Sequence, residues 1–322
     1  VRYLPIRKRL LQIMTTLFVS HSDCLNHVTP SGHPEQVARL QFILDAVEDL
    51  NLRRLDAPLA EDAHILSAHP ERYLEHLKTL SPSRGSVAVD ADTHMSAGSL
   101  NAAYRAVGGV IEAVDQVIQG ASQNAFVAVR PPGHHAETAT TMGFCFFGNV
   151  AIGAKHALDH HGLTRVAVVD FDVHHGNGTQ DLLWDEARAL TITSHQSPLW
   201  PGTGTPDEKG AHDNVLNVPL PPRSGGDVMR KAYEDRVFPR LEDFKPEMIF
   251  VSAGFDAHEA DPLAELRWDE DDFVWITKHL MRIADRHSQG RLVSVLEGGY
   301  DLAALARSVR AHVKTLSGDK PQ

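Results

Sequence analysis

Short apolar runs that alternate with longer helical patterns restrict the fold of this chain more than any other feature. The runs do not alternate apolar with polar residues, which is typical of parallel strands buried on both faces of a sheet. The expected strands are 16–20, 125–129, 165–170, 189–193, 247–252 and 291–296. The expected helices are 34–50, 70–79, 98–119, 147–161, 226–243, 269–288 and 301–316. With no internal repeat or long linker, the pattern predicts a single doubly wound α/β domain.

The N-terminal region has a basic segment, 7–9, before the apolar run 10–19, as secretion signals do. Polar residues interrupt that run and no small-residue cleavage site follows it, so we do not interpret it as a signal. We expect translation to begin naturally at Met14, residues 1–13 to be a disordered extension, and the domain to span 14–322. No apolar run reaches the roughly 20 residues that a membrane-spanning helix needs.

Charge and cysteine content argue against two further classes. The chain has 31 basic and 42 acidic side chains, a formal net charge of −11, whereas a dedicated nucleic-acid-binding protein needs a basic surface. Cys24 and Cys145 are the two cysteines; they cannot form a disulfide framework and suit a reducing compartment, so we expect a cytoplasmic protein. We expect no nucleic-acid or membrane partner, and the sequence leaves open whether the chain forms a homo-oligomer.

Reactive residue types gather after four of the expected strands. In open parallel sheets, ligands bind beyond the carboxyl ends of the strands. The segments rich in His, Asp and Tyr at those ends are 130–135, 170–179, 253–262 and 297–301. The long loops that we expect to be functional are 81–97, 130–146 and 194–225. The sequence therefore predicts a reactive rim at one edge of the sheet.

A metal site is the most specific prediction for this rim. Residues i and i+2 of an extended chain point to the same side, so Asp172 and His174 can bind one ion. Asp256, after another strand, can complete an Asp/His/Asp set. Three protein ligands leave a position open for water, which is typical of catalytic zinc, although Fe²⁺, Co²⁺ or Mn²⁺ would also tolerate these oxygen-rich ligands. A lone Asp-x-His could be a surface turn, but the three other strand ends argue against that interpretation.

Two adjacent histidines, His134 and His135, indicate acid–base chemistry. Both cannot be charged cheaply beside a metal, so we expect their pKa values to separate. A buried Asp170 would orient one ring and raise its pKa, while Asn177 could accept a hydrogen bond from the other and leave it neutral as a general base. Tyr300 could donate to a developing oxyanion opposite the metal. A core histidine pair and a structural Gly-Gly-Tyr turn are the alternatives.

These segments together resemble the histone deacetylase superfamily, and most of all its class II-like bacterial branch, the histone deacetylase-like amidohydrolases. The matching motifs are Arg130-Pro-Pro-Gly-His-His-Ala136, Gly143-Phe-Cys-Phe-Phe147, Asp170-Phe-Asp-Val-His-His-Gly-Asn-Gly-Thr179, Pro201-Gly-Thr-Gly204, Ser252-Ala-Gly-Phe-Asp256, Asp261-Pro262 and Glu297-Gly-Gly-Tyr300. The resemblance covers about 20–316 in the expected order. It implies the arginase/deacetylase fold with an eight-stranded parallel sheet. It also implies a zinc-dependent hydrolase that removes acetyl or other acyl groups from N-acylated amines, chiefly the lysine side chains of proteins or peptides.

The resemblance carries specific roles onto this chain. The implied zinc ligands are Asp172, His174 and Asp256. The implied catalytic residues are His135 as general base, His134 as electrostatic partner or acid, Asp170 as the partner of His134, Asn177 beside His135, and Tyr300 as oxyanion donor. A structural K⁺ site is implied at Asp170 and Thr193, with the backbone of Asp172 and His174. Substrate contacts are implied at Phe144, Asp92, Gly298 and Leu263, with a wall opposite Phe144 in 200–204. Arg39, below the metal, is implied in product release.

Departures from the family pattern narrow the expectation. Asn177 stands where class I enzymes carry Asp, and Tyr300 stands where some weakly active class II members carry His. Acetylpolyamine deacetylases tend to carry an acidic residue after Asp-Pro, where this chain has Leu263, which weakens that small-molecule alternative. A binuclear Mn²⁺ ureohydrolase would need further Asp ligands. A non-catalytic acyl-lysine reader would not need the complete set of ligands, base and tyrosine.

The remaining histidines have simpler interpretations. We expect His175 at the site and His195 and His258 in supporting loops nearby. His156 and His160, four residues apart on a helix, could bind a metal, but a solvated helix face is the stronger interpretation. We expect surface or helix-end positions for His64, His69, His76, His94, His279, His287 and His312. Cys145 is expected to be a buried, inert thiol.

Overall fold

Eight parallel strands form the centre of the molecule, in the order β2-β1-β5-β10-β9-β6-β7-β8. This computed structural model describes residues 15–318, so the expected start at Met14 and the extension 1–13 lie outside the described residues. The strands are β1 (Leu17–Ser20), β2 (Arg53–Asp56), β5 (Asn124–Val127), β6 (Val166–Asp170), β7 (Ala189–Gln196), β8 (Val215–Leu220), β9 (Met248–Ala253) and β10 (Leu292–Leu296). A separate antiparallel pair, β3 (Ser86–Ala88) and β4 (His94–Ser96), lies in the expected loop 81–97.

The inner strands are buried on both faces, as their continuous apolar runs predict. Every residue of β5, β6, β7, β9 and β10 is buried. The two strands missed by the sequence reading are the edges of the sheet. β2 alternates half-buried with exposed residues and begins with Arg53 and Arg54, while β8, inside the expected loop 194–225, contains Pro219. Edge strands need less apolar surface and tolerate proline, because one side of their backbone is unpaired.

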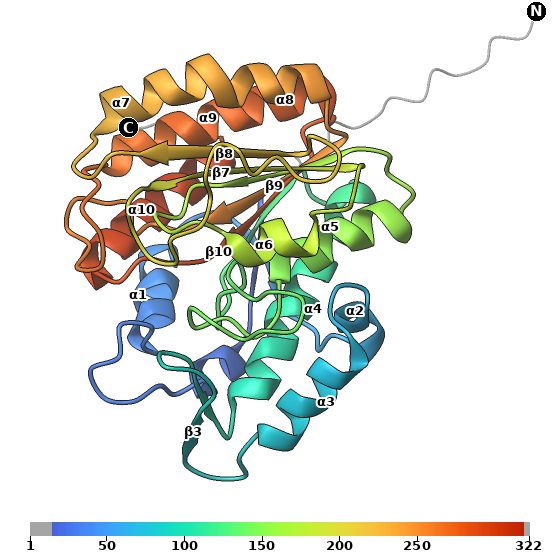
Figure 1. Cartoon of the computed structure of the whole chain (residues 1–322), viewed down its shortest axis with the longest axis vertical. Coiled ribbons are helices and arrows are strands. Elements are labelled where there is room, and N and C mark those ends of the chain that lie inside the picture. Colours follow the sequence, from blue (N-terminus) through green and yellow to red (C-terminus); the bar gives the residue numbers. More distant parts are fainter. Residues whose placement is uncertain (1–14, 319–322) are drawn as a thin grey trace, which may run out of the picture.

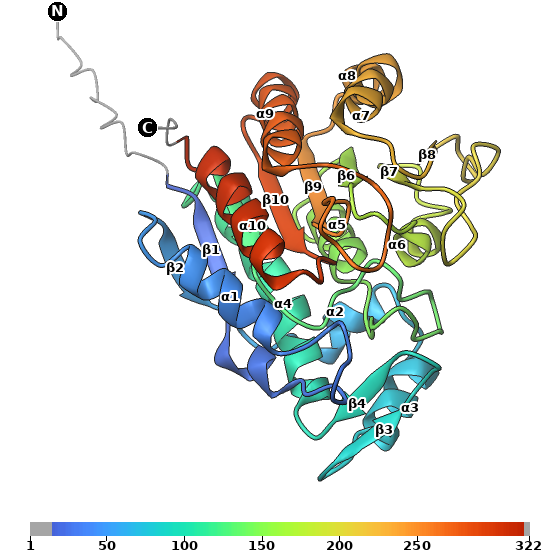
Figure 2. The same ribbon diagram turned by 90° about the vertical axis from the view of Figure 1, so that its left-hand side faces the viewer.

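Helices cover both faces of the sheet (Figures 1 and 2). One layer holds α1 (Ala38–Ala46), α9 (Glu270–His287) and α10 (Leu302–Leu316), with α7 (Gly226–Ala232) and α8 (Phe238–Phe244) beside them. The other layer holds α4 (Ser99–Ile118) and α5 (Asn149–Asp159). The remaining helices are α2 (Asp62–Leu66), α3 (Glu71–Leu80) and α6 (Asn177–Leu182), with a 3-10 turn at Ser22–Asn26.

The expected helix 226–243 is interrupted. A π-helical turn, Tyr233–Val237, separates α7 from α8. Pro239 stands in the first turn of α8 and has no backbone N–H to donate, which explains why one uniform α-helix does not run through this segment. Within residues 15–318, no helix combines the length and the apolar character that crossing a membrane requires.

The order of the strands places the four reactive segments side by side. β5, β10, β9 and β6 are consecutive neighbours in the sheet, and all their pairings are parallel. Their carboxyl ends therefore meet at one edge, although the segments that follow them are up to about 170 residues apart in the sequence (130–135 and 297–301). The predicted doubly wound sheet and its reactive rim are both present.

Candidate active site

Three buried side chains at the rim form a candidate metal centre. One ligand atom from each of Asp172, His174 and Asp256 lies within 4.8 Å of the other two. Nδ1 of His174 is 3.2 Å from Oδ1 of Asp172 and 3.2 Å from Oδ2 of Asp256. The remaining carboxylate oxygens are held by backbone: Asp256 Oδ1 accepts from the N–H of Val173, and Asp172 Oδ2 from that of Gly298. Two carboxylates and one imidazole on a fixed frame are a donor set that zinc accepts.

The electrostatics of these three groups favour a cation. Burial disfavours the charged form of His174, but its hydrogen bonds with Asp172 and Asp256 raise its pKa to about 10. Burial and the charge of Asp172 raise the pKa of Asp256 to about 7. Within residues 15–318, histidines are the only ion-pair partners of the two carboxylates. A bound cation would compensate this buried negative charge.

The neighbouring histidines have different partners. Nδ1 of His134 lies 3.0 Å from Oδ2 of Asp170, and Nδ1 of His135 lies 2.8 Å from Oδ1 of Asn177. Burial opposes charge on His134, but the carboxylates of Asp172 and Asp170 hold its pKa well above the usual range. Burial and the adjacent charge of His134 hold the pKa of His135 well below that range. The two environments therefore separate the two pKa values, so that His134 favours the charged form and His135 the neutral form.

Asn177 also fixes which nitrogen of His135 is basic. The Nδ2 group of Asn177 donates to Oε1 of Glu137 at 2.8 Å, which turns the amide oxygen toward His135. Because that oxygen can only accept, Nδ1 of His135 must carry the hydrogen, and the lone pair of Nε2 is left for a substrate or water. Glu137 was not singled out from the sequence, and only its position after the His134-His135 motif could have drawn attention to it.

A cavity of about 200 Å³ opens beside these groups. His135, His174 and Tyr300 line it together with the aromatic rings of Phe144 and Trp200. The ring of Trp200 packs edge-on against His135 at 4.7 Å, so the wall expected in 200–204 begins with this residue. Also lining the cavity are Asp92, Gly143, Leu199 and Leu263.

Phe144 is held in place by residues for which no role was predicted from the sequence. Phe144 has a positive φ of 68°, and its N–H donates to Oγ1 of Thr93 at 3.0 Å. The ring of His33 packs edge-on against it at 4.7 Å, and Nε2 of His33 lies 2.8 Å from the carbonyl oxygen of Asp92. The loop that carries Asp92 is thereby attached to the cavity wall.

Tyr300 lines the cavity, whereas Gly298 packs against the candidate metal ligands. The Tyr300 N–H donates to Oδ2 of Asp261 at 2.7 Å, and desolvation raises the pKa of its hydroxyl well above the usual range, so the hydroxyl remains a donor. Gly298 does not line the cavity, contrary to the substrate contact expected for it. A Cβ at Gly298 would stand 2.1 Å from Oδ2 of Asp256, so only glycine lets this backbone approach the metal ligands.

Arg39 lies beneath the site and does not line the cavity. It is fully buried and donates to the carbonyl oxygens of Gly299 and Glu297, at 2.6 and 2.5 Å. Its guanidinium also lies 4.9 Å from the centre of the Tyr300 ring. Glu35 joins Arg39 to a second buried arginine, Arg130, by ion pairs of 3.0 and 2.5 Å. This ionic cluster fixes the turn that carries Tyr300.

Other predicted residues are placed as follows. Asp170 and Thr193 are register partners on β6 and β7, and the buried Oγ1 of Thr193 has no hydrogen-bond partner within residues 15–318. His175 and His195 are buried and 4.9 Å apart, but they face away from the cavity, and His175 contacts Thr203 and Gln180 instead. Cys145 is buried, and desolvation raises its thiol pKa well above the usual range.

The surface or helix-end positions predicted for two histidines, His69 and His312, are wrong. His69 and His312 are each only 1% exposed. His69 accepts from the Gly148 N–H, and His312 bridges Thr277 and Ser294. Both are core histidines whose partners are distant in sequence, which a local pattern cannot reveal.

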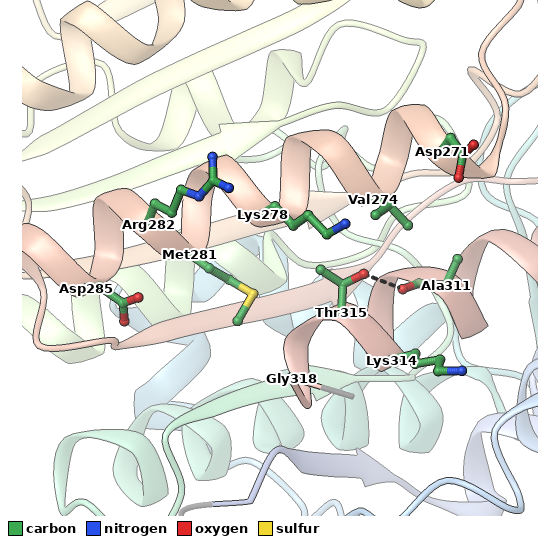
Figure 3. Close-up of a pocket in the computed structure, with 10 residues that line it drawn as sticks. All are labelled: Asp271, Val274, Lys278, Met281, Arg282, Asp285, Ala311, Lys314, Thr315 and Gly318. Carbon is green, nitrogen blue, oxygen red and sulfur yellow. Dashed lines mark hydrogen bonds between the residues drawn. The ribbon is translucent and has the colours of Figure 1, made fainter. Parts of the chain in front are cut away.

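Another cavity, of about 600 Å³, lies between α9 and α10 (Figure 3). It is bordered by Lys278, Arg282 and Lys314 together with Asp271 and Asp285. None of the predicted site residues lines it, whereas several of them line the smaller cavity at the strand ends.

Comparisons with known proteins agree with this geometry. The model of the histone deacetylase domain matches residues 33–316. A histone deacetylase-like amidohydrolase from Pseudomonas aeruginosa is 41% identical over 299 residues, which cover 89% of this chain and 78% of that protein. A probable deacetylase from Archaeoglobus fulgidus is 36% identical over 298 residues, with 90% and 82% covered. The crystal structure of the HDA15 HD domain superposes with a TM-score of 0.89 at 29% identity, covering 96% of this chain and 90% of that one. The expected arginase/deacetylase fold is confirmed, and the chain belongs to the histone deacetylase family.

Proposed function

We propose that this protein is a zinc-dependent hydrolase that removes acetyl or other acyl groups from N-acylated amines, foremost the N6-acetyl-lysine side chain of proteins or peptides. The observation that carries the proposal is the cavity that Phe144 and Trp200 line. It is also lined by an imidazole with a lowered pKa, a candidate metal ligand and a phenol with a raised pKa, which are His135, His174 and Tyr300. Family membership supports hydrolase activity in general, and this arrangement supports amide hydrolysis in particular.

Asp172, His174 and Asp256 would hold the zinc ion. When bound there, zinc polarises an acyl carbonyl and lowers the pKa of a bound water. Asp170 and Thr193, with the backbone carbonyls of Asp172 and His174, would hold a structural K⁺. The buried Thr193 hydroxyl without a partner supports that assignment, because a buried oxygen without a hydrogen bond is costly unless a cation or water satisfies it.

The chain's own groups divide the proton transfers. His135 takes the proton of the attacking water at Nε2, because its pKa is low and Asn177 occupies Nδ1. His134, kept cationic by Asp172 and Asp170, passes a proton to the leaving amine. The Tyr300 hydroxyl donates to the developing oxyanion, and the Arg39 cluster holds the turn that positions it.

The cavity walls favour a substrate with a slender aliphatic chain. Phe144, Trp200 and Leu263 offer apolar surface that suits the methylene groups of lysine. Asp92 lines the same cavity and could accept backbone N–H groups of a peptide at its rim. These contacts support an acylated lysine peptide over a free polyamine, whose additional ammonium groups would face the apolar Leu263.

The direct test offers the purified enzyme matched acetyl-lysine peptides, longer acyl-lysine peptides and acetylpolyamines, with released acid quantified. We expect acid release from the lysine peptides with the highest kcat/KM. Binding of those peptides without turnover across the whole panel would contradict the proposal and favour an acyl-lysine reader.

A further inference from the structure

A second cluster of imidazoles lies at the C-terminal end of α5, away from the active-site cavity. His156, His160 and His161 each offer a ring nitrogen, and these atoms lie within 4.8 Å of one another. The rings of His156 and His160 are stacked with centroids 4.7 Å apart. The ring of His161 stands perpendicular to both, at 5.1 and 4.9 Å. Three imidazoles therefore converge on a small volume.

The end of the helix explains why the three rings meet. His156 and His160 are one turn apart on the same face of α5. His161 follows directly, and the N–H groups of both His160 and His161 donate to the carbonyl oxygen of His156. Gly162 then adopts a positive φ of 71°, which ends the helix and turns the chain. The sequence spacing brings together only His156 and His160, for which a solvated helix face was the stronger interpretation, and His161 joins them through this turn.

A carboxylate from the neighbouring helix completes the cluster. Oδ1 of Asp115, on α4, lies 2.7 Å from Nε2 of His156 and 2.6 Å from Nε2 of His161. The His160 ring makes no hydrogen bond within residues 15–318. Imidazoles that bind metals are commonly oriented by a carboxylate, or share the metal with one. Asp115 is in position for either role. A simple ion pair of Asp115 with His156 and His161 would not explain why the His160 ring also lies here.

The surroundings are open and acidic. The cluster borders a hollow of about 480 Å³. Its lining contains four carboxylates, from Glu61, Glu112, Asp115 and Asp159, against one ammonium from Lys155. The His160 side chain is exposed, and those of His156 and His161 are partly buried. Solvent can therefore supply the remaining ligands of an ion bound here.

We propose that His156, His160 and His161 form, with Asp115, a second metal site that takes a divalent transition-metal ion of the zinc class. Imidazole ligands suit Zn²⁺, Co²⁺, Ni²⁺ and Cu²⁺ far better than Mg²⁺ or Ca²⁺. An ion at this site joins α5 to α4. Because the ion would link two helices outside the active-site cavity, its role is to stabilise the helix pair.

The test uses untagged protein whose active site already holds one Zn²⁺. Zn²⁺ and Co²⁺ are titrated by calorimetry, Co²⁺ absorption reports the ligands, and Tm is measured with and without metal. His160→Asn and His161→Asn remove one imidazole each from solvent-accessible positions. His76→Asn, an exposed histidine of α3 outside the cluster, is the matched control.

The wild type and the control should bind a second equivalent and gain Tm, while both cluster variants should bind it at least about tenfold more weakly and lose the gain. Unchanged second-site affinity in both cluster variants, or no second equivalent in the wild type, would overturn the proposal. Dependence on His161 also distinguishes this site from a binuclear active centre, which would not lose an ion when the end of α5 is altered.

Discussion

Two histidine-containing clusters in this molecule use the same ligand types in opposite surroundings. Asp172, His174 and Asp256 are buried at the carboxyl ends of two adjacent strands and open into a cavity with a base and a phenol. The α5 cluster, His156, His160 and His161 with Asp115, lies at a helix end beside an acidic, open hollow. The comparison shows that ligand identity alone does not define a catalytic site. Burial, an enclosed cavity and neighbouring groups with separated pKa values do.

The largest difference is expected on removing a strand-end ligand. Asp256→Ala should abolish metal binding at the active site and lower kcat/KM by about 10³-fold or more, because a bound metal is worth several kcal/mol of transition-state stabilisation. Acyl-lysine hydrolysis and metal content are the measurements. His160→Asn is the matched change in the other cluster, and an equal loss of activity there would remove the distinction between the two clusters.

The next largest effect is expected at Tyr300. Tyr300→Phe should lower kcat by about 10²- to 10³-fold and leave the active-site metal content unchanged, because only an oxyanion donor is lost. Turnover at the wild-type rate would contradict the proposed role of the hydroxyl.

A smaller, pH-dependent change is expected at Asn177. The base must be neutral to act, and burial with the charge of His134 holds the pKa of His135 below its usual range, so activity is lost only as pH falls well into the acid range. Asn177→Asp would place a negatively charged carboxylate beside Nδ1 of His135 and raise the pKa of the imidazole. The acid limb of the kcat/KM profile should therefore move to higher pH by about one unit or more. An acid limb that does not move would show that His135 is not the titrating base.

The alkaline limb reports on the other histidine. His134 must be protonated to act as the acid, and its raised pKa keeps it charged above neutral pH. Asp170→Asn should lower that pKa, so activity should decline at lower pH than in the wild type. A shift of the alkaline limb to higher pH would indicate that His135 is the acid and His134 the base.

The smallest effect is expected for His156→Gln in the α5 cluster. It should change kcat/KM by less than about twofold, since His156 touches neither the cavity nor its walls, while removing the metal-dependent gain in Tm. A large loss of activity without loss of metal would assign this cluster a catalytic role.

Much of the fold could be predicted because the inner strands are uniformly apolar. The edges could not, since Arg53 and Arg54 open one edge strand and Pro219 lies in the other. The candidate ligands were found because each follows a strand end, and parallel strands bring such ends together.

The features that could not be predicted from the sequence depend on contacts between distant segments. His312 is buried because the hydroxyl groups of Thr277 and Ser294 form hydrogen bonds with its two ring nitrogens. Glu35 matters because two arginines, 4 and 95 residues away, converge on its carboxylate. The sequence favours a solvated helix face at His156 and His160, because the approach of Asp115 from α4 cannot be seen in the pattern of one helix.

The adjacency of β6 and β9 has a consequence for how the proposed active-site metal would be acquired. Asp172 and His174 are two residues apart and can bind an ion weakly in an unfolded chain, but Asp256 joins them only when these two strands pair. Such long-range pairing forms slowly, because an 82-residue segment must close first. Tight metal capture should therefore mark a late event in folding, so that the time course of metal uptake during refolding would report the moment at which the centre of the sheet is assembled.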